Sequence, residues 1–187
     1  MKIGIILGSI REERSGASVA EWVVSQAAKR DDVTYELIDL KSFDVPLLTS
    51  ATVPGAANKQ YDDERVTRWS QTIDSYDGFI FVTPEYNHSV PGGLKNAFDS
   101  LGSEWANKPV AFVSYGAEGG VRAVEHWRQI VNNFHMYPVR QQISLSLFTE
   151  FGAEGVEPAE RRTEEIATLF DQLEAATRRF SLVEAHA

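Results

Sequence analysis

The sequence contains no cysteine among its 187 residues. Disulfide bonds, thiolate metal sites, cysteine nucleophiles and redox-active dithiols are therefore excluded together. If the protein takes part in electron transfer, the redox group must belong to a bound cofactor, because the side chains supply none of these groups.

Long apolar runs and long basic runs are also missing. Residues 1–8 carry one charge and a short apolar stretch broken by Gly4 and Gly8, which is too short for a signal-peptide core or a membrane span. With 27 acidic against 18 basic residues, the formal net charge is −9, and the surface as a whole repels polyanions. We expect a cytoplasmic protein that binds neither a membrane nor nucleic acid.

Common catalytic and metal-binding patterns are absent as well. His126 and His135 are nine residues apart and do not share a helix face, and neither has an acidic residue at metal-ligand spacing, so we expect no metal site. His88 is expected at the surface. Ser9 and Ser89 lack the Gly-x-Ser-x-Gly elbow of a serine hydrolase.

Five short apolar runs, each typical of a buried strand, alternate with segments of helical periodicity. The runs are residues 3–7, 35–38, 79–82, 110–114 and 139–145. This alternation predicts an α/β fold, a doubly wound parallel sheet with helices on both faces, in one domain over residues 1–187. A last helix is predicted over residues 158–183. Residues 42–61 and 149–157 fit neither pattern and are predicted to be loops, and a loop as long as the first is usually functional or mobile.

The first predicted strand runs into a polar segment, residues 8–18, with the features of a phosphate-binding loop. Backbone N–H groups, the hydroxyls of Ser9 and Ser15 and a helix start would surround one point, and such a point attracts an anion. Arg11 adds a cation suited to charge-assisted hydrogen bonds. Alternatively, serine hydroxyls only cap the helix and the arginines pair with neighbouring glutamates. The Walker A and Gly-x-Gly-x-x-Gly patterns are absent, so Asp39 is expected to cap a helix or loop rather than to bind an adenosine ribose.

Two further loops follow the third and fourth predicted strands. Pro84 lacks a backbone N–H and ends the third strand, and Pro91 suits the first turn of a helix, with Glu-Tyr-Asn-His-Ser-Val between them. The fourth strand leads into the glycine-rich residues 114–120. In a sheet of order 2-1-3-4-5 the loops after strands 1, 3 and 4 converge on one crevice, and glycines there allow a flat ring to approach the backbone.

Residues 84–99 resemble the Pro-Glu-Tyr-Asn motif and the helix that follows it in the NADPH-dependent FMN reductase family, and residues 8–15 resemble the phosphate loop of that family. The resemblance implies a flavodoxin-like, five-stranded sheet of order 2-1-3-4-5 that binds FMN. It implies that the FMN phosphate contacts Ser9, Arg11, Ser15, Gly16 and Ala17. It also implies that the ring lies against Pro84, Glu85, Tyr86, Asn87, Ser114, Tyr115, Gly116, Gly119 and Gly120. The resemblance does not extend to Arg14, because many members of the family have a different residue at that position.

The activity implied by this resemblance is hydride transfer from NADPH, or NADH, to bound FMN and on to a second acceptor. The acceptor would be free flavin, a quinone, an azo compound or a metal ion, and no side chain need act as a catalytic acid or base because the flavin carries the chemistry. Two alternatives stay open: a flavodoxin-type electron carrier without nicotinamide turnover, and a ligand-binding domain without any turnover.

The resemblance also implies a homodimer or homotetramer. Residues 94–101 and 121–134, together with Trp105 and Trp127, carry more apolar surface than two helices usually need to cover a sheet. We therefore predict that these segments form a dimer face. The alternative is that their aromatic residues belong to the core.

Overall fold

The computed structural model describes the backbone of residues 1–184 and the side chains of residues 1–180. Five parallel strands form one sheet in the order β2-β1-β3-β4-β5, which confirms the predicted fold. Every predicted strand lies within an observed one. The strands are β1 (Lys2–Leu7), β2 (Thr34–Asp39), β3 (Gly78–Pro84), β4 (Pro109–Gly116) and β5 (Tyr137–Ser146).

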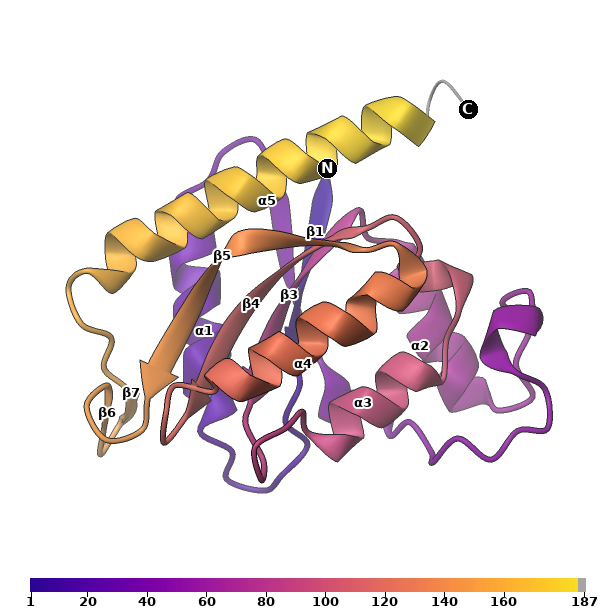
Figure 1. Ribbon diagram of the computed structural model, residues 1–187, viewed down its shortest axis with the longest axis horizontal. Coiled ribbons are helices and arrows are strands. Elements are labelled where there is room, and N and C mark those ends of the chain that lie inside the picture. The colour runs from indigo at the N-terminus through magenta and orange to yellow at the C-terminus, as the bar shows by residue number, and fades with distance from the viewer. Residues whose placement is uncertain (185–187) are drawn as a thin grey trace.

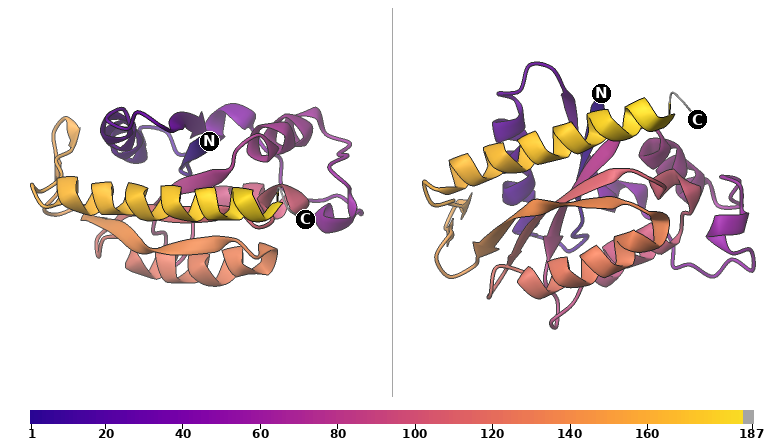
Figure 2. Two further views of the ribbon diagram at one scale, coloured as in Figure 1. Left: turned by 90° about the horizontal axis from the view of Figure 1, so that it is seen from above. Right: turned by 45° about the horizontal axis from the view of Figure 1, so that its top comes forward.

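Helices cover both faces of the sheet (Figures 1 and 2). The core between the sheet and α1 (Gly16–Ala27) and α5 (Arg162–Glu184) forms one apolar cluster. The opposite face packs a second cluster against α2 (Glu64–Asp74), α3 (Gly92–Asp99) and α4 (Val121–Val131). Because both faces are covered, the central strands β3 and β4 are buried over their whole length, as their unbroken apolar sequences predict.

The aromatic side chains that were predicted to form a dimer face lie in the core instead. Trp105 and Trp127 are fully buried. The ring of Phe98 stacks on Trp105 at 4.9 Å between centroids and meets Trp127 edge-on at 5.6 Å. This part of the prediction is wrong, because α3, the 3-10 turn Ser103–Trp105 and α4 all direct their large side chains towards the same face of the sheet.

Two differences from the predicted elements lie near the carboxyl end. The last helix begins at Arg162, four residues later than expected, after a turn in which the Arg162 N–H donates to the Ala159 carbonyl at 2.8 Å. Residues 149–157, predicted to be a plain loop, contain a small antiparallel pair, β6 (Phe151–Gly152) and β7 (Gly155–Val156). Strands of two residues carry no periodicity that sequence analysis can detect.

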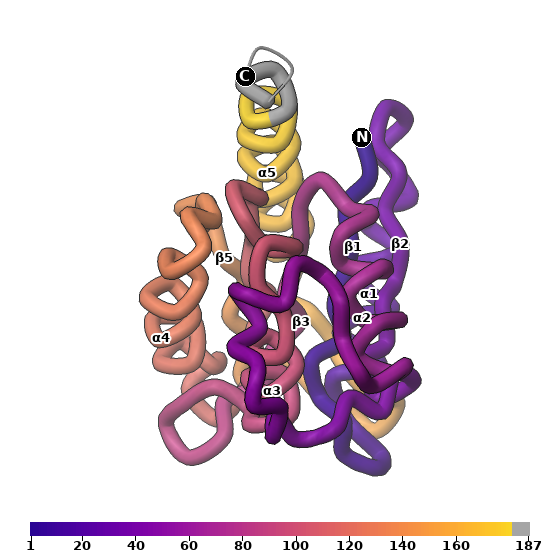
Figure 3. The backbone as a smooth tube through the Cα atoms, turned by 90° about the vertical axis from the view of Figure 1, so that its right-hand side faces the viewer, coloured from indigo at the N-terminus to yellow at the C-terminus, as the bar shows by residue number. Residues whose placement is uncertain are grey.

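The predicted loop of residues 42–61 overlaps the 3-10 turn Leu40–Phe43, contains a second one at Pro54–Ala56 and is otherwise irregular. Figure 3 shows it crossing the side of the molecule on which α2 and α3 lie. None of the helices within residues 1–184 is long and apolar enough to cross a membrane.

Candidate functional site

Three loops meet at the carboxyl ends of β1, β3 and β4, at the lower edge of the sheet in Figure 1. They are the β1–α1 loop (residues 8–15), the β3–α3 loop (residues 85–91) and the β4–α4 loop (residues 117–120). The sheet order makes the three strands neighbours, so the loops contact one another directly. The hydroxyls of Ser9 and Tyr86 are 3.0 Å apart, and the Glu85 N–H donates to the Tyr115 carbonyl at 3.1 Å.

The β1–α1 loop presents unused hydrogen-bond donors. The backbone N–H groups of residues 11–15 donate to no other group within residues 1–184. Arg11 is exposed and has no carboxylate partner in that part of the chain, and its guanidinium lies 5.9 Å from the centre of the Tyr86 ring. Free amides and an unpaired guanidinium are among the donors that a phosphate group requires.

The alternative in which this segment only caps a helix does not describe the structure. Ser15 stands at the N-cap position of α1, but its side chain makes no capping hydrogen bond. The arginines do not pair with the neighbouring glutamates either, because Glu12 pairs with Lys41 and Arg14 pairs with Asp39. Asp39 accepts the Lys41 N–H at 3.0 Å and so caps the following 3-10 turn, as expected.

Gly16 and Ala17 begin α1, and Gly16 lies next to the side chain of Tyr115 on β4. A Cβ atom at Gly16 would lie 2.3 Å from the phenol oxygen of Tyr115, so glycine alone permits this close approach of helix and tyrosine. Tyr115 is buried, and burial, with a smaller contribution from Tyr86, raises the pKa of its phenol above the ordinary range. A tyrosine is already protonated at neutral pH at its ordinary pKa, and the raised pKa keeps the Tyr115 hydroxyl protonated at higher pH as well.

The β3–α3 loop is a tight hairpin. Tyr86 and Ser89 exchange two backbone hydrogen bonds of 3.0 Å, and Asn87 and His88 both have left-handed backbone conformations, with φ of 50° and 67°. Two successive positive φ values are typical of a type I′ turn. The turn directs the Tyr86 phenol onto the β1–α1 loop, so Tyr86 joins the two loops that the sequence assigns to the phosphate and the ring.

The side chain of Glu85 anchors the hairpin to α4. It accepts the Arg122 backbone N–H at 3.1 Å and also forms an ion pair with the Arg122 guanidinium. One helical turn further on, His126 Nδ1 lies 2.9 Å from the Ser89 hydroxyl. Sequence analysis missed Arg122 and assigned His126 no partner. Arg122 and His126 are four residues apart and therefore lie on one face of the helix. The sequence does not show that this face contacts the β3–α3 hairpin.

The β4–α4 loop is a glycine turn that is held in place by a hydrogen bond from Ser114. The buried Ser114 hydroxyl donates to the Gly119 carbonyl at 2.7 Å, and the Gly119 N–H donates to the Gly116 carbonyl at 3.1 Å. Gly119 and Gly120 have φ of 69° and 74°, and a Cβ at Gly120 would lie 3.0 Å from the Tyr115 backbone nitrogen. Pro84 pairs with Tyr115 across the two strands, so the hairpin and the glycine turn form one continuous backbone surface.

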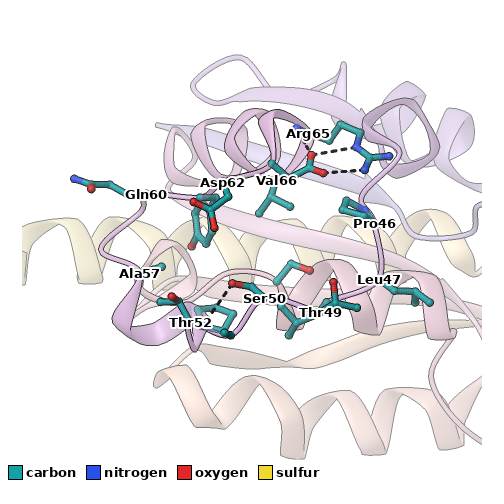
Figure 4. Close-up of a pocket in the computed structure, with 16 residues that line it drawn as sticks. Pro46, Leu47, Thr49, Ser50, Thr52, Ala57, Gln60, Asp62, Arg65 and Val66 are labelled. Carbon is teal, nitrogen blue, oxygen red and sulfur yellow. Dashed lines mark hydrogen bonds and ion pairs between the residues drawn. The ribbon is translucent and has the colours of Figure 1, made fainter.

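A separate cavity of about 480 Å³ lies under the loop of residues 42–61, next to the start of α2 (Figure 4). The Asn96 side chain holds the loop by donating to the Pro46 carbonyl at 2.8 Å and accepting the Leu48 N–H at 3.0 Å. The buried carboxylate of Glu104 accepts the Tyr61 hydroxyl at 2.7 Å. None of the predicted site residues lines this cavity. Within the described part of the chain no cluster of His, Asp or Glu could hold a metal ion.

Comparison with known proteins identifies the family. The family model described as NADPH-dependent FMN reductase matches residues 1–150. The chain belongs to the NADPH-dependent FMN reductase family. This confirms the resemblance seen in the sequence and favours an FMN- and NAD(P)H-dependent oxidoreductase over a flavodoxin-type carrier.

Individual relatives agree with this membership of the NADPH-dependent FMN reductase family. The chain is 45% identical over 126 residues to an NAD(P)H-dependent FMN reductase of a Nectria species, a match that covers 65% of this chain and 63% of the relative. It is 32% identical over 169 residues to an NAD(P)H-dependent FMN reductase of Schizosaccharomyces pombe, covering 90% and 84%. The fold is shared with the NAD(P)H:(acceptor) oxidoreductase FerB of Paracoccus denitrificans, with a TM-score of 0.75, 20% identity, and 94% and 98% of the two chains covered.

Proposed function

We propose that this chain is an FMN-dependent oxidoreductase that takes hydride from NADPH or NADH and reduces a small-molecule acceptor. The observation that carries the proposal is the β1–α1 loop, in which the backbone amides of residues 11–15 make no hydrogen bond within the described chain and Arg11 has no carboxylate partner there, in a chain of net charge −9. A strongly acidic protein gains nothing from an exposed anion site unless a specific anionic ligand occupies it, and the terminal phosphate of FMN is such a ligand.

The residues present fit FMN in two parts. The β1–α1 loop and the start of α1 would hold the phosphate through Ser9, Arg11, Ser15, Gly16 and Ala17, with the Tyr86 hydroxyl beside Ser9. The ring would lie against the backbone surface built from the hairpin and the glycine turn, through Pro84, Glu85, Tyr86, Asn87, Ser114, Tyr115, Gly116, Gly119 and Gly120. When bound, FMN supplies the hydride-accepting chemistry that the protein lacks.

The protein's own groups would bind and orient rather than exchange protons. Glu85 and Ser114 are engaged in holding the loops, and burial raises the pKa of Tyr115 further above its ordinary value, so its phenol stays protonated. Asn87 and His88 project from a rigid turn, which fixes the backbone beside them. Such a site would act through preorganised main-chain groups, and no side chain is proposed as a catalytic acid or base.

For the acceptor we propose a quinone or an azo compound, because relatives of this chain include a quinone reductase of Escherichia coli and an NADPH azoreductase of a Bacillus species. Steady-state turnover of the FMN-loaded protein with NADPH and a benzoquinone tests this. We expect double-reciprocal plots with parallel lines, because the donor leaves before the acceptor binds. Turnover of NADPH without any quinone or azo reduction would contradict the acceptor assignment.

We further propose that the protein is a homodimer or homotetramer in the cytoplasm. With the tryptophans and Phe98 in the core, the support for association is a surface depression of about 390 Å³ beside α3 and α4, which Val53 of the 42–61 loop, Ile130 and Phe134 help to line. Sedimentation at micromolar concentration should give a species of at least twice 20.9 kDa. A species of 20.9 kDa that holds FMN tightly would contradict an obligate dimer. Cell fractionation tests the proposed cytoplasmic location.

A further inference from the structure

The β1–α1 loop is not held in shape by its own backbone. Its flanking main-chain bonds run from the Gly8 N–H to the Val82 carbonyl at 2.9 Å and from the Ala17 N–H to the Arg14 carbonyl at 3.1 Å. Between them, the amides of residues 11–15 have no partner within residues 1–184. Fixing the backbone of one residue costs about 1–2 kcal/mol. If the loop were disordered before binding, the ligand would have to order it, and this cost would lower the affinity.

Side chains supply the missing constraint, and Arg14 is the central one. Its Nη1 donates to the Ser9 carbonyl at 2.8 Å, which closes the loop across five residues. Its Nη2 forms an ion pair with Asp39 at the end of β2. The Arg14 side chain is only 14% exposed, so this contact is screened less than an ordinary surface pair.

Asp39 is itself fixed, because its second carboxylate oxygen accepts the Lys41 N–H at 3.0 Å. The contact therefore ties the loop to a rigid strand end. Both terminal nitrogens of Arg14 are engaged, which leaves Arg11 as the cation of the loop without a carboxylate partner in the described chain.

A second ion pair joins the same two segments but differs in its surroundings. Lys41 Nζ lies 2.6 Å from Glu12 Oε2, and the Glu12 side chain is 87% exposed. Exposed pairs contribute little, because water and salt screen them and long side chains lose entropy. The substitution Glu12→Gln therefore serves as a matched control, because it removes a carboxylate from the loop and leaves Arg14 and Asp39 in place.

We propose that Arg14 and Asp39 are positioning residues that form a latch, and that this latch holds the β1–α1 loop open as a phosphate site before any ligand arrives. The inference rests on the proposed function, since it takes the phosphate of FMN as the ligand. The latch residues act through the loop and do not touch the phosphate themselves. Arg11 and the free amides are the groups that do.

Titration of the full-length, FMN-stripped protein with FMN and with riboflavin, which lacks the phosphate, tests the latch. Asp39→Asn and Arg14→Ala should each weaken FMN binding about tenfold, the effect of ordering roughly one loop residue. Riboflavin affinity should change little in both variants. Glu12→Gln should change FMN affinity less than about twofold. In the Arg14→Ala background, Asp39→Asn should add no further loss, because the two residues act as one pair.

The possible outcomes are distinguishable. If Arg14 leaves Asp39 to bind the phosphate directly, Asp39→Asn will tighten FMN binding or leave it unchanged, and the latch is overturned. Equal loss of FMN and riboflavin affinity in Asp39→Asn indicates a general structural defect and also overturns it. Arg11→Ala, measured alongside, reports on the phosphate site itself: if it has no effect, the proposed site fails, whereas an effect of Arg11→Ala without one of Asp39→Asn overturns the latch alone.

Discussion

Arg11 offers a clean perturbation of the proposed FMN site, because the fold does not depend on its side chain. It is exposed, has no ion pair within residues 1–184, and touches the Tyr86 ring only at 5.9 Å. Replacement by alanine should therefore change the free energy of unfolding by less than about 0.5 kcal/mol, as is usual for surface substitutions. A charge-assisted hydrogen bond contributes about 1.5–3 kcal/mol. Its loss weakens FMN binding by roughly tenfold to more than a hundredfold.

Isothermal titration of FMN into the stripped protein measures this effect directly. Arg140→Ala is the matched control: Arg140 is an exposed arginine on β5, and its guanidinium makes no bond to the other described residues. Both variants change the net charge equally. An Arg11→Ala protein that binds FMN as tightly as the unmodified chain would refute the assignment of the phosphate. An equal loss in Arg140→Ala would show that overall charge, rather than a contact, controls affinity.

Two further substitutions test the framework of the site. Gly16→Ala should cost about 1–3 kcal/mol of stability, because its Cβ would lie 2.3 Å from the Tyr115 hydroxyl. Gly92→Ala, with no atom within 4 Å of the added methyl group, should cost nothing in the same thermal unfolding experiment. Glu150→Gln should cost about 3–5 kcal/mol at pH 7, since the buried carboxylate pairs with Arg162. Hydrogen bonds from Arg162 lower the pKa of Glu150, so its contribution is complete above the ordinary glutamate pKa and disappears as the pH falls through the lowered value. Denaturant unfolding should then show that the difference in free energy of unfolding between the unmodified chain and Glu150→Gln, measured at pH 7, becomes smaller below about pH 4. A difference of the same size at low pH would contradict the assignment to the Glu150 carboxylate.

The sequence predicts the sheet well because buried parallel strands have unbroken apolar sequences. Residues 79–82 and 110–114 lie inside strands that are buried on both faces. The glycine turn was also predictable, because Gly119 and Gly120 occupy left-handed conformations that other residues rarely adopt.

What the sequence does not reveal is which side chains meet across loops. The burial of Trp105 follows from the direction of a short 3-10 turn, and apolar content alone cannot distinguish a core residue from one at an interface. The ion pairs of Arg14 with Asp39 and of Glu85 with Arg122 join residues 25 and 37 positions apart. Neither follows from local periodicity. The hairpin at Asn87 and His88 was missed because this pair lacks the glycine that usually marks a type I′ turn.

The central claim is that this chain passes hydride from a nicotinamide to bound FMN. The most direct measurement is anaerobic titration of the FMN-loaded protein with NADPH, followed by absorbance of the flavin. We predict that an equimolar amount of NADPH removes the yellow colour completely, and that a quinone or free FMN added afterwards restores it. If neither NADPH nor NADH removes the colour while dithionite does, the claim is contradicted and the chain is an electron carrier or a flavin-binding protein without nicotinamide turnover.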